Sequence, residues 1–183
     1  MMSILRTRTQ SGATLIEILI SLLMIAFGLL GIAGFITKST TLTSETTQRA
    51  RASALLSDMA ARISSNKPIA AGYVAAASAN PDLGKAVESC VGKVAAALDV
   101  CQWSNLLAGV NDAGSTGNSA ALGFRGCITK PTADANYVVA VAWGAMSQSF
   151  PPADSFGAGS FGDDTYRRVL RAQVRIPNLG SSP

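Results

Sequence analysis

The feature that most constrains this chain is an apolar stretch close to its N-terminus. From Ala13 to Ile36 the sequence runs for 24 residues with a single charged side chain, Glu17. As a helix rising about 1.5 Å per residue, the stretch would be roughly 36 Å long, enough to cross the hydrocarbon core of a bilayer with some tilt. We therefore expect a membrane-spanning anchor.

The residues before this stretch predict how the anchor is oriented. Residues 1–12 are polar, with Arg6 and Arg8 and no acidic residue. The positive-inside rule places such a segment in the cytoplasm and the C-terminal part of the chain across the membrane. A secretory signal would have a shorter apolar core, of about 7 to 15 residues, followed by an A-x-A-like cleavage site. No such site follows directly here, so an exported domain on a single span is expected.

Glu17 is the exception within the apolar stretch. A carboxylate inside an apolar helix is costly and normally has a partner or a function. Glu17 lies only four residues past Ala13, near enough to the end of the stretch to reach the lipid headgroups. These residues alone therefore leave two interpretations of Glu17 open: a charge that is tolerated at the membrane interface, or a carboxylate with a function.

The string from Ser11 to Glu17, SGATLIE, resembles the type III signal of type IV prepilins, in which glycine precedes the cut and glutamate is the fifth residue after it. The resemblance implies cleavage between Gly12 and Ala13 by prepilin peptidase, followed by N-methylation of the new terminus. It also implies that Glu17 pairs with the positively charged terminus of a neighbouring subunit during assembly. The sequence departs from the family at Ala13, where a large apolar residue is usual.

Helical spacing continues beyond the apolar run. One face of residues 37–66 carries apolar side chains at intervals of three and four, namely Leu55, Leu56, Met59 and Ile63. Pro68 should end this helix. We predict one helix from Ala13 to Asn66, about 80 Å long, whose outer half packs against a sheet.

Three glycines recur every third residue within the anchor, at Gly28, Gly31 and Gly34. They favour either close helix packing or local melting in an assembled fibre. The alternative is that glycine is simply frequent in transmembrane helices. Since no proline interrupts the anchor, any bend there is expected at these glycines.

The rest of the chain, residues 67–183, is expected to form one globular head. Composition and pattern predict a short helix at 85–98, loops at 109–121 and 147–164, and strands at 122–128, 137–143 and 168–176. The last strand should bury its alternating aliphatic side chains, which are Leu170, Ala172, Val174 and Ile176. A helix followed by antiparallel strands gives an α+β fold, with the sheet laid against the outer half of the long helix.

The head carries a second resemblance. The phrases DVCQWSN at 99–105, GCI at 126–128, VAVAW at 139–143 and FGDDTYRRV at 161–169 are similar to the PilV group of minor pilins, the type IV pilus modification proteins. The resemblance implies the pilin fold and a location in the inner membrane with a periplasmic head, followed by assembly into an extracellular pilus. The implied partners are other minor and major pilins, prepilin peptidase and the inner-membrane assembly platform.

The three cysteines permit three single disulfide pairings. They suit a compartment where one disulfide forms and one thiol is left over. Pairing of Cys90 with Cys101 would close a short loop and resembles the arrangement of the PilV family. The pairings with Cys127 remain the alternatives, and Cys127 lacks the later cysteine that often accompanies it in relatives.

The chain contains no histidine, which excludes Ser-His-Asp and Cys-His catalysis and any zinc site that uses histidine. We therefore expect a chain that is not an enzyme and that carries no cofactor or metal. Asp163 and Asp164, beside Gly162, could supply oxygen ligands to calcium, but nothing nearby completes a site of six to eight oxygens. A turn before a strand is the favoured interpretation of these acids.

Charge gives no reason to expect a nucleic-acid partner. The net charge of +4 falls to +2 when residues 1–12 are removed. The densest basic run is expected to be a solvated face, and its members are Arg167, Arg168, Arg171 and Arg175. Trp103 and Trp143 are expected to be core side chains rather than a binding surface.

Together these features predict an assembly subunit, a minor pilin that initiates or modifies a type IV pilus. A minor pseudopilin of type II secretion would share the leader and Glu17, and the head phrases favour the pilus. A tip adhesin with a ligand-binding head and a membrane-tethered enzyme are the alternatives from other classes. The enzyme is disfavoured because the chain lacks histidine and any nucleophile motif.

Overall fold

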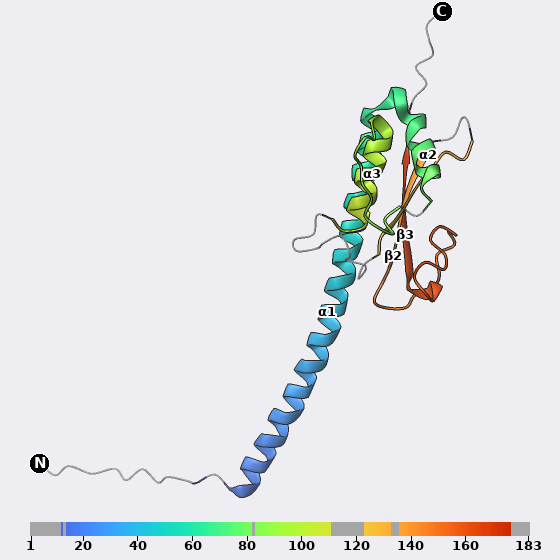
Figure 1. The fold of residues 1–183 in the computed structure, drawn as a ribbon. Coiled ribbons are helices and arrows are strands. Elements are labelled where there is room, and N and C mark those ends of the chain that lie inside the picture. Colours follow the sequence, from blue (N-terminus) through green and yellow to red (C-terminus); the bar gives the residue numbers. More distant parts are fainter. Residues whose placement is uncertain (1–11, 13, 82, 111–122, 133–135, 177–183) are drawn as a thin grey trace, which may run out of the picture. The chain divides into compact units, whose positions relative to one another are not determined.

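The computed structural model describes Gly12 and residues 14–81, 83–110, 123–132 and 136–176. Within these residues the chain is α+β, with a long N-terminal helix, two shorter helices and a small antiparallel sheet (Figure 1). The chain divides at Leu42 and Thr43 into an N-terminal unit and a compact head. The expected α+β class, with a long N-terminal helix and a small antiparallel sheet, is confirmed. The predicted loop at 109–121 lies mostly outside the described residues.

Helix α1 runs from Leu15 to Ser65, close to the predicted limits. Ala13 lies outside the described residues. Pro68 lies in the first turn of a short 3-10 helix, η1 (Lys67–Ile69), so the chain leaves α1 at the expected place. Helix α2 (Ala70–Ala79) follows η1 directly.

The shorter helices correct the prediction for residues 67–107. Helix α2 was not expected, because its run of alanines around Tyr73 shows little contrast between apolar and polar positions. The helix predicted at 85–98 is wrong, since α3 spans Ala95–Leu107 and residues 84–94 form turns. Gly92 has a φ of 79°, a left-handed backbone conformation that does not occur inside a regular α-helix, so no helix can run through this position.

The sheet has three antiparallel strands in the order β1-β2-β3. They are β1 (Arg125–Thr129), β2 (Tyr137–Gly144) and β3 (Arg167–Val174), which confirms all three predicted strands with shifted ends. The register pairs Cys127 with Ala140 and Val139 with Ala172. Since side chains alternate along a strand, Val139 and Ala172 share one face and Cys127 and Ala140 share the other.

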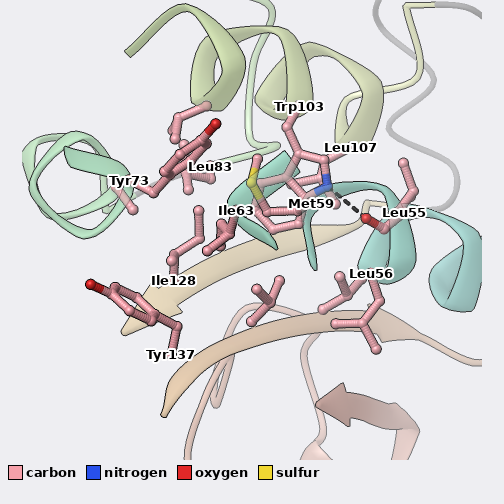
Figure 2. Packing of buried hydrophobic residues seen from close by; sticks show 14 of the residues in the cluster. Leu55, Leu56, Met59, Ile63, Tyr73, Leu83, Trp103, Leu107, Ile128 and Tyr137 are labelled. Atoms are coloured by element: carbon pink, nitrogen blue, oxygen red, sulfur yellow. Dashed lines mark hydrogen bonds between the residues drawn. The ribbon is translucent and has the colours of Figure 1, made fainter. Parts of the chain in front are cut away.

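The core of the head joins α1, the two short helices and one face of the sheet. The predicted apolar face of α1 is buried, with Met59 and Ile63 fully enclosed. Figure 2 shows these side chains meeting Trp103 of α3 and Ile128 of β1. The Trp103 Nε1–H donates to the carbonyl of Leu55 at 2.9 Å, which satisfies the indole inside the core. The expectation that Trp103 is a core residue is confirmed, as it is for Trp143.

The two outer strands bury less than the middle one. Both faces of β2 are almost entirely buried, as its continuous apolar run YVVAVAW would require. Strand β3 lies at an edge of the sheet, and of its predicted aliphatic set only Val174 is buried. Leu170, Ala172 and Ile176 are half-buried, so the burial expected for this strand is confirmed only in part.

Candidate functional site

The start of α1 places the predicted cleavage point beside a helix cap. Gly12 is exposed, and no heavy atom lies within 4 Å of the position that a Cβ would take. The backbone N–H of Glu17 donates to the carbonyl of Thr14 at 3.0 Å and lies 3.4 Å from the Thr14 hydroxyl. Glu17 lies in the first helical turn, where its carboxylate interacts favourably with the positive end of the helix dipole.

The N-terminal unit exposes a continuous apolar surface. Every Leu, Ile, Met and Phe side chain from Leu15 to Ile36 is exposed in the single chain. At about 1.5 to 3 kcal/mol for each side chain that leaves water, these side chains represent tens of kcal/mol of favourable burial. Among the described residues, α1 is the one helix long and apolar enough to span a membrane.

The glycines of the apolar segment have no packing partner among the residues that the structure describes. No heavy atom lies within 4 Å of a Cβ placed at Gly28, Gly31 or Gly34. Within the described residues, nothing therefore requires glycine at these three positions. Both interpretations, close packing against another helix and ordinary glycine use in a spanning helix, remain open.

The acids at 163 and 164 are engaged in local structure. Asp163 accepts the backbone N–H of Thr165 at 3.0 Å and caps the 3-10 helix η2 (Asp164–Tyr166), while Asp164 pairs with Arg167. The expected turn before a strand is confirmed. In the part of the chain that the structure describes, no group of three or more His, Cys, Asp or Glu side chains is placed to hold a metal ion.

Arg167 corrects the expectation of a solvated basic face. Its side chain is only 2% exposed, whereas Arg171 on the same strand is 51% exposed. The Arg167 guanidinium bonds both carboxylate oxygens of Asp164, at 2.5 and 2.7 Å, and donates to the carbonyls of Asp154 and Phe156. The hydrogen bond from Arg167 lowers the pKa of Asp164 below its usual value. Arg167 therefore holds the 152–164 loop against the sheet.

Cys90 and Cys101 form a disulfide with a Cα–Cα distance of 5.8 Å, which is the pairing that the family resemblance implies. It ties the turns at 84–94 to α3. Cys127 is free and half-buried on β1. Burial raises the pKa of the Cys127 thiol, with Arg171 opposing the rise, so this thiol is not an activated nucleophile.

A polar cluster closes the end of the head where α1 meets α2 and α3. The Tyr73 hydroxyl donates to Asp99 at 2.5 Å and accepts from Asn66 at 2.9 Å. Arg62 donates to Asp99 at 3.1 Å and to Asp58 at 3.0 Å. Burial, followed by the hydrogen bond to Asp99, raises the pKa of Tyr73 to about 12. Arg62 and Tyr73 therefore both bind Asp99, and the cluster links α1 to α2 and α3.

Alkaline pH is expected to destabilise the head through Tyr73. The pKa of Tyr73 in the folded head, about 12, exceeds the ordinary 10.0. The contribution of Tyr73 to the free energy of unfolding is therefore complete below pH 10 and is lost as the pH rises through 12. Over this range the free energy of unfolding should fall by up to about 1.4 kcal/mol per pH unit more in the wild type than in Tyr73→Phe. Urea unfolding of both proteins across this range measures the difference, and parallel pH profiles would contradict the assignment.

One contact of the head joins residues far apart in the sequence. The backbone N–H of Ser147 donates to Glu45 of α1 at 2.9 Å, and the Ser147 hydroxyl bonds the same carboxylate oxygen. Sequence reasoning missed this contact, because no local pattern relates two residues 102 positions apart. Arg167 did carry a local signal, since Asp164 lies three residues before it.

Comparison of the chain with models of protein families, with curated proteins and with solved structures found no match. What bears on function is therefore the sequence signal at Ser11–Glu17 and the physical character of the two units.

Proposed function

We propose that this chain is a minor pilin subunit of a type IV pilus, made as a membrane-anchored precursor and cleaved after Gly12. The observation that carries the proposal is the coincidence of the SGATLIE signal with the start of a helix whose apolar surface the rest of the chain leaves uncovered. Cleavage on the N-terminal side of such a helix leaves it intact as an anchor. The same surface would then enter a filament core.

In this role the chain is a substrate of processing and a component of assembly, rather than an enzyme. Glu17 would pair with the methylated N-terminus of a neighbouring pilin, a charge that offsets the cost of burying a carboxylate among apolar helices. The head, whose loops are held by a disulfide and by Arg167, would present lateral contacts to other pilins. The proposed location is the inner membrane, with the head in the periplasm, before assembly into the pilus.

Cleavage after Gly12 is the test. Intact mass of the chain co-expressed with prepilin peptidase should show loss of residues 1–12 from the wild type. Gly12→Leu should keep its leader, because a large side chain replaces glycine before the scissile bond. Gly28→Ala is the control, since it changes a glycine of α1 away from the cleavage point that likewise has no neighbour within 4 Å among the described residues, and it should be processed normally.

Two outcomes would overturn the proposal. A wild-type chain that keeps residues 1–12 in the presence of active peptidase is not a prepilin. A chain cut beyond Ile36 is a secreted protein that has lost its apolar segment. If cleavage occurs as expected, capture of pilins rather than secretion-system components with the processed chain separates the pilus from the pseudopilin alternative.

A further inference from the structure

We propose that the free edge of strand β3 binds an extended, acidic segment of a partner protein, which would add a further strand to the sheet of the head. The inference goes beyond the proposed function, because it concerns the head alone. It depends neither on cleavage after Gly12 nor on the anchor.

Two hydrogen bonds outside the sheet show which way the backbone groups of β2 point. The N–H of Gly126 in β1 donates to the carbonyl of Leu83 at 3.1 Å, so it faces away from β2. Consecutive residues of a strand point their backbone groups to opposite sides, and Gly126 lies opposite Val141, so the backbone groups of Val141 face β3. The N–H of Ala145 agrees with this alternation, since it donates to the carbonyl of Tyr166 at 2.8 Å.

The same alternation leaves three residues of β3 with backbone groups that face away from the sheet. Val141 is paired with Leu170, so the backbone of Leu170 faces β2. The backbones of Val169, Arg171 and Gln173 therefore face outward. Among the described residues, the N–H and C=O groups of these three have no hydrogen-bond partner. Val169 is half-buried and the other two are exposed, so another strand has access to this edge.

The remaining parts of the sheet edges are closed. On β1, Gly126 is bonded to Leu83, and Ile128, whose backbone faces the same way, is only 2% exposed. At the start of β3, the Arg168 guanidinium donates to the carbonyl of Arg167 at 3.0 Å. The open stretch is therefore 169–173. An unpaired strand edge of this kind binds an extended peptide through main-chain hydrogen bonds.

The charge of β3 indicates that the added strand is acidic. Residues 167–175, RRVLRAQVR, contain four arginines and no Asp or Glu. Arg171 and Arg175 lie on the outer face of the sheet and are exposed. Arg171 pairs with Asp154, whereas Arg175 has no ion pair among the described residues. Acidic side chains on an added strand would lie opposite these two arginines, an arrangement that stabilises neighbouring strands.

A second copy of this chain fits the edge poorly. The symmetric antiparallel pairing that uses all three open residues is centred on Arg171. It would set Arg171 opposite its own copy and Arg167 opposite Arg175. Like charges directly opposite one another destabilise a strand pair, and charged side chains on an edge strand prevent self-pairing. The edge therefore favours a different chain that carries acidic residues.

Amide hydrogen exchange of the full chain in detergent micelles tests the open edge. The probe is a short synthetic peptide with blocked ends, in which glutamate alternates with valine. Without peptide, the amides of Val169, Arg171 and Gln173 should exchange faster than those of Leu170 and Ala172, which are bonded to β2. Exchange at the first three should slow about tenfold when peptide occupies about nine-tenths of the chains. Uniform exchange along β3, or a peptide that does not slow it, would overturn the proposal.

Control peptides separate strand addition from attraction between charges. A peptide with lysine in place of glutamate should not bind. Methyl groups on the glutamate nitrogens or on the valine nitrogens block opposite edges of the peptide, and only one edge faces β3. One methylated peptide should therefore lose binding while the other binds like the parent. Equal binding of both would show that charge alone attracts the peptide, and the proposal would be wrong.

A matched pair of variants tests the same edge on the protein. Gln173→Pro removes an N–H that faces away from β2, so it leaves the bonds to β2 intact and should weaken peptide binding about tenfold. Gln173→Val keeps this N–H and should bind like the wild type. Equal affinity of the two variants would contradict the proposal. None of these measurements involves cleavage after Gly12, so their failure and failure of the proposed function are distinguishable.

Discussion

Replacement of Gly126 by alanine is expected to lower the free energy of unfolding of the head by about 3 kcal/mol. A Cβ at Gly126 would lie 2.5 Å from both Leu107 Cδ1 and Trp103 Cη2, far inside van der Waals contact. Trp103 has no room to retreat, because it is fully buried and its indole N–H is bonded to Leu55 of α1. The glycine is therefore what lets α3 approach β1 so closely.

Denaturant unfolding of the full chain in detergent, followed by tryptophan emission, measures this effect. Gly144→Ala is the matched control on the neighbouring strand, since the nearest atom to its Cβ would be Phe161 Cδ1 at 3.4 Å, an ordinary contact. Trp103→Phe should create space, so the double variant with Gly126→Ala should lose less stability than the sum of the single changes. Full additivity would mean that the Cβ does not meet the indole.

The sequence predicted those elements whose apolar pattern has a strong period. Met59 and Ile63 repeat at helical spacing and are buried, and the YVVAVAW run is the middle strand. Both predictions depend on a local apolar pattern, and the structure buries the apolar side chains of that pattern. Helix α2 was not predicted because alanine is compatible with buried and exposed positions alike, and the residues between the buried Tyr73 and Ala77 are also apolar, namely Val74, Ala75 and Ala76.

Contacts between distant residues could not be predicted in this way. Nothing in the residues around Gly126 shows that Trp103 lies against it, and nothing around Glu45 shows that Ser147 binds it. The candidate cleavage site is the opposite case. Its proposed signal is a linear string of residues, so Gly12 and Glu17 were identified without any tertiary structure, and the fold adds only that Gly12 is exposed ahead of the helix.

Arg167 shows how an alternation rule fails where a loop covers the outer face of a sheet. Its place on β3 predicts a side chain directed away from the core of the head, and that direction points into the 152–164 loop. Arg167→Met is accordingly expected to lower the free energy of unfolding by about 3 kcal/mol, because it leaves the Asp164 carboxylate and two partly buried carbonyl oxygens without their donor. Arg171→Met, on the same strand, should cost less than about 1 kcal/mol, since that arginine is half exposed.

The loop itself should report the change. With Arg167 replaced, the carbonyls of Asp154 and Phe156 lose their donor, and chymotrypsin should cut after Phe156 or Phe161 under native conditions. Arg167→Lys should rescue little, because an ammonium cannot reproduce the bidentate bond to Asp164 together with both carbonyl bonds. If Arg167→Lys matched the wild type in stability and in resistance to chymotrypsin, charge alone would hold the loop, and the argument from guanidinium geometry would be wrong.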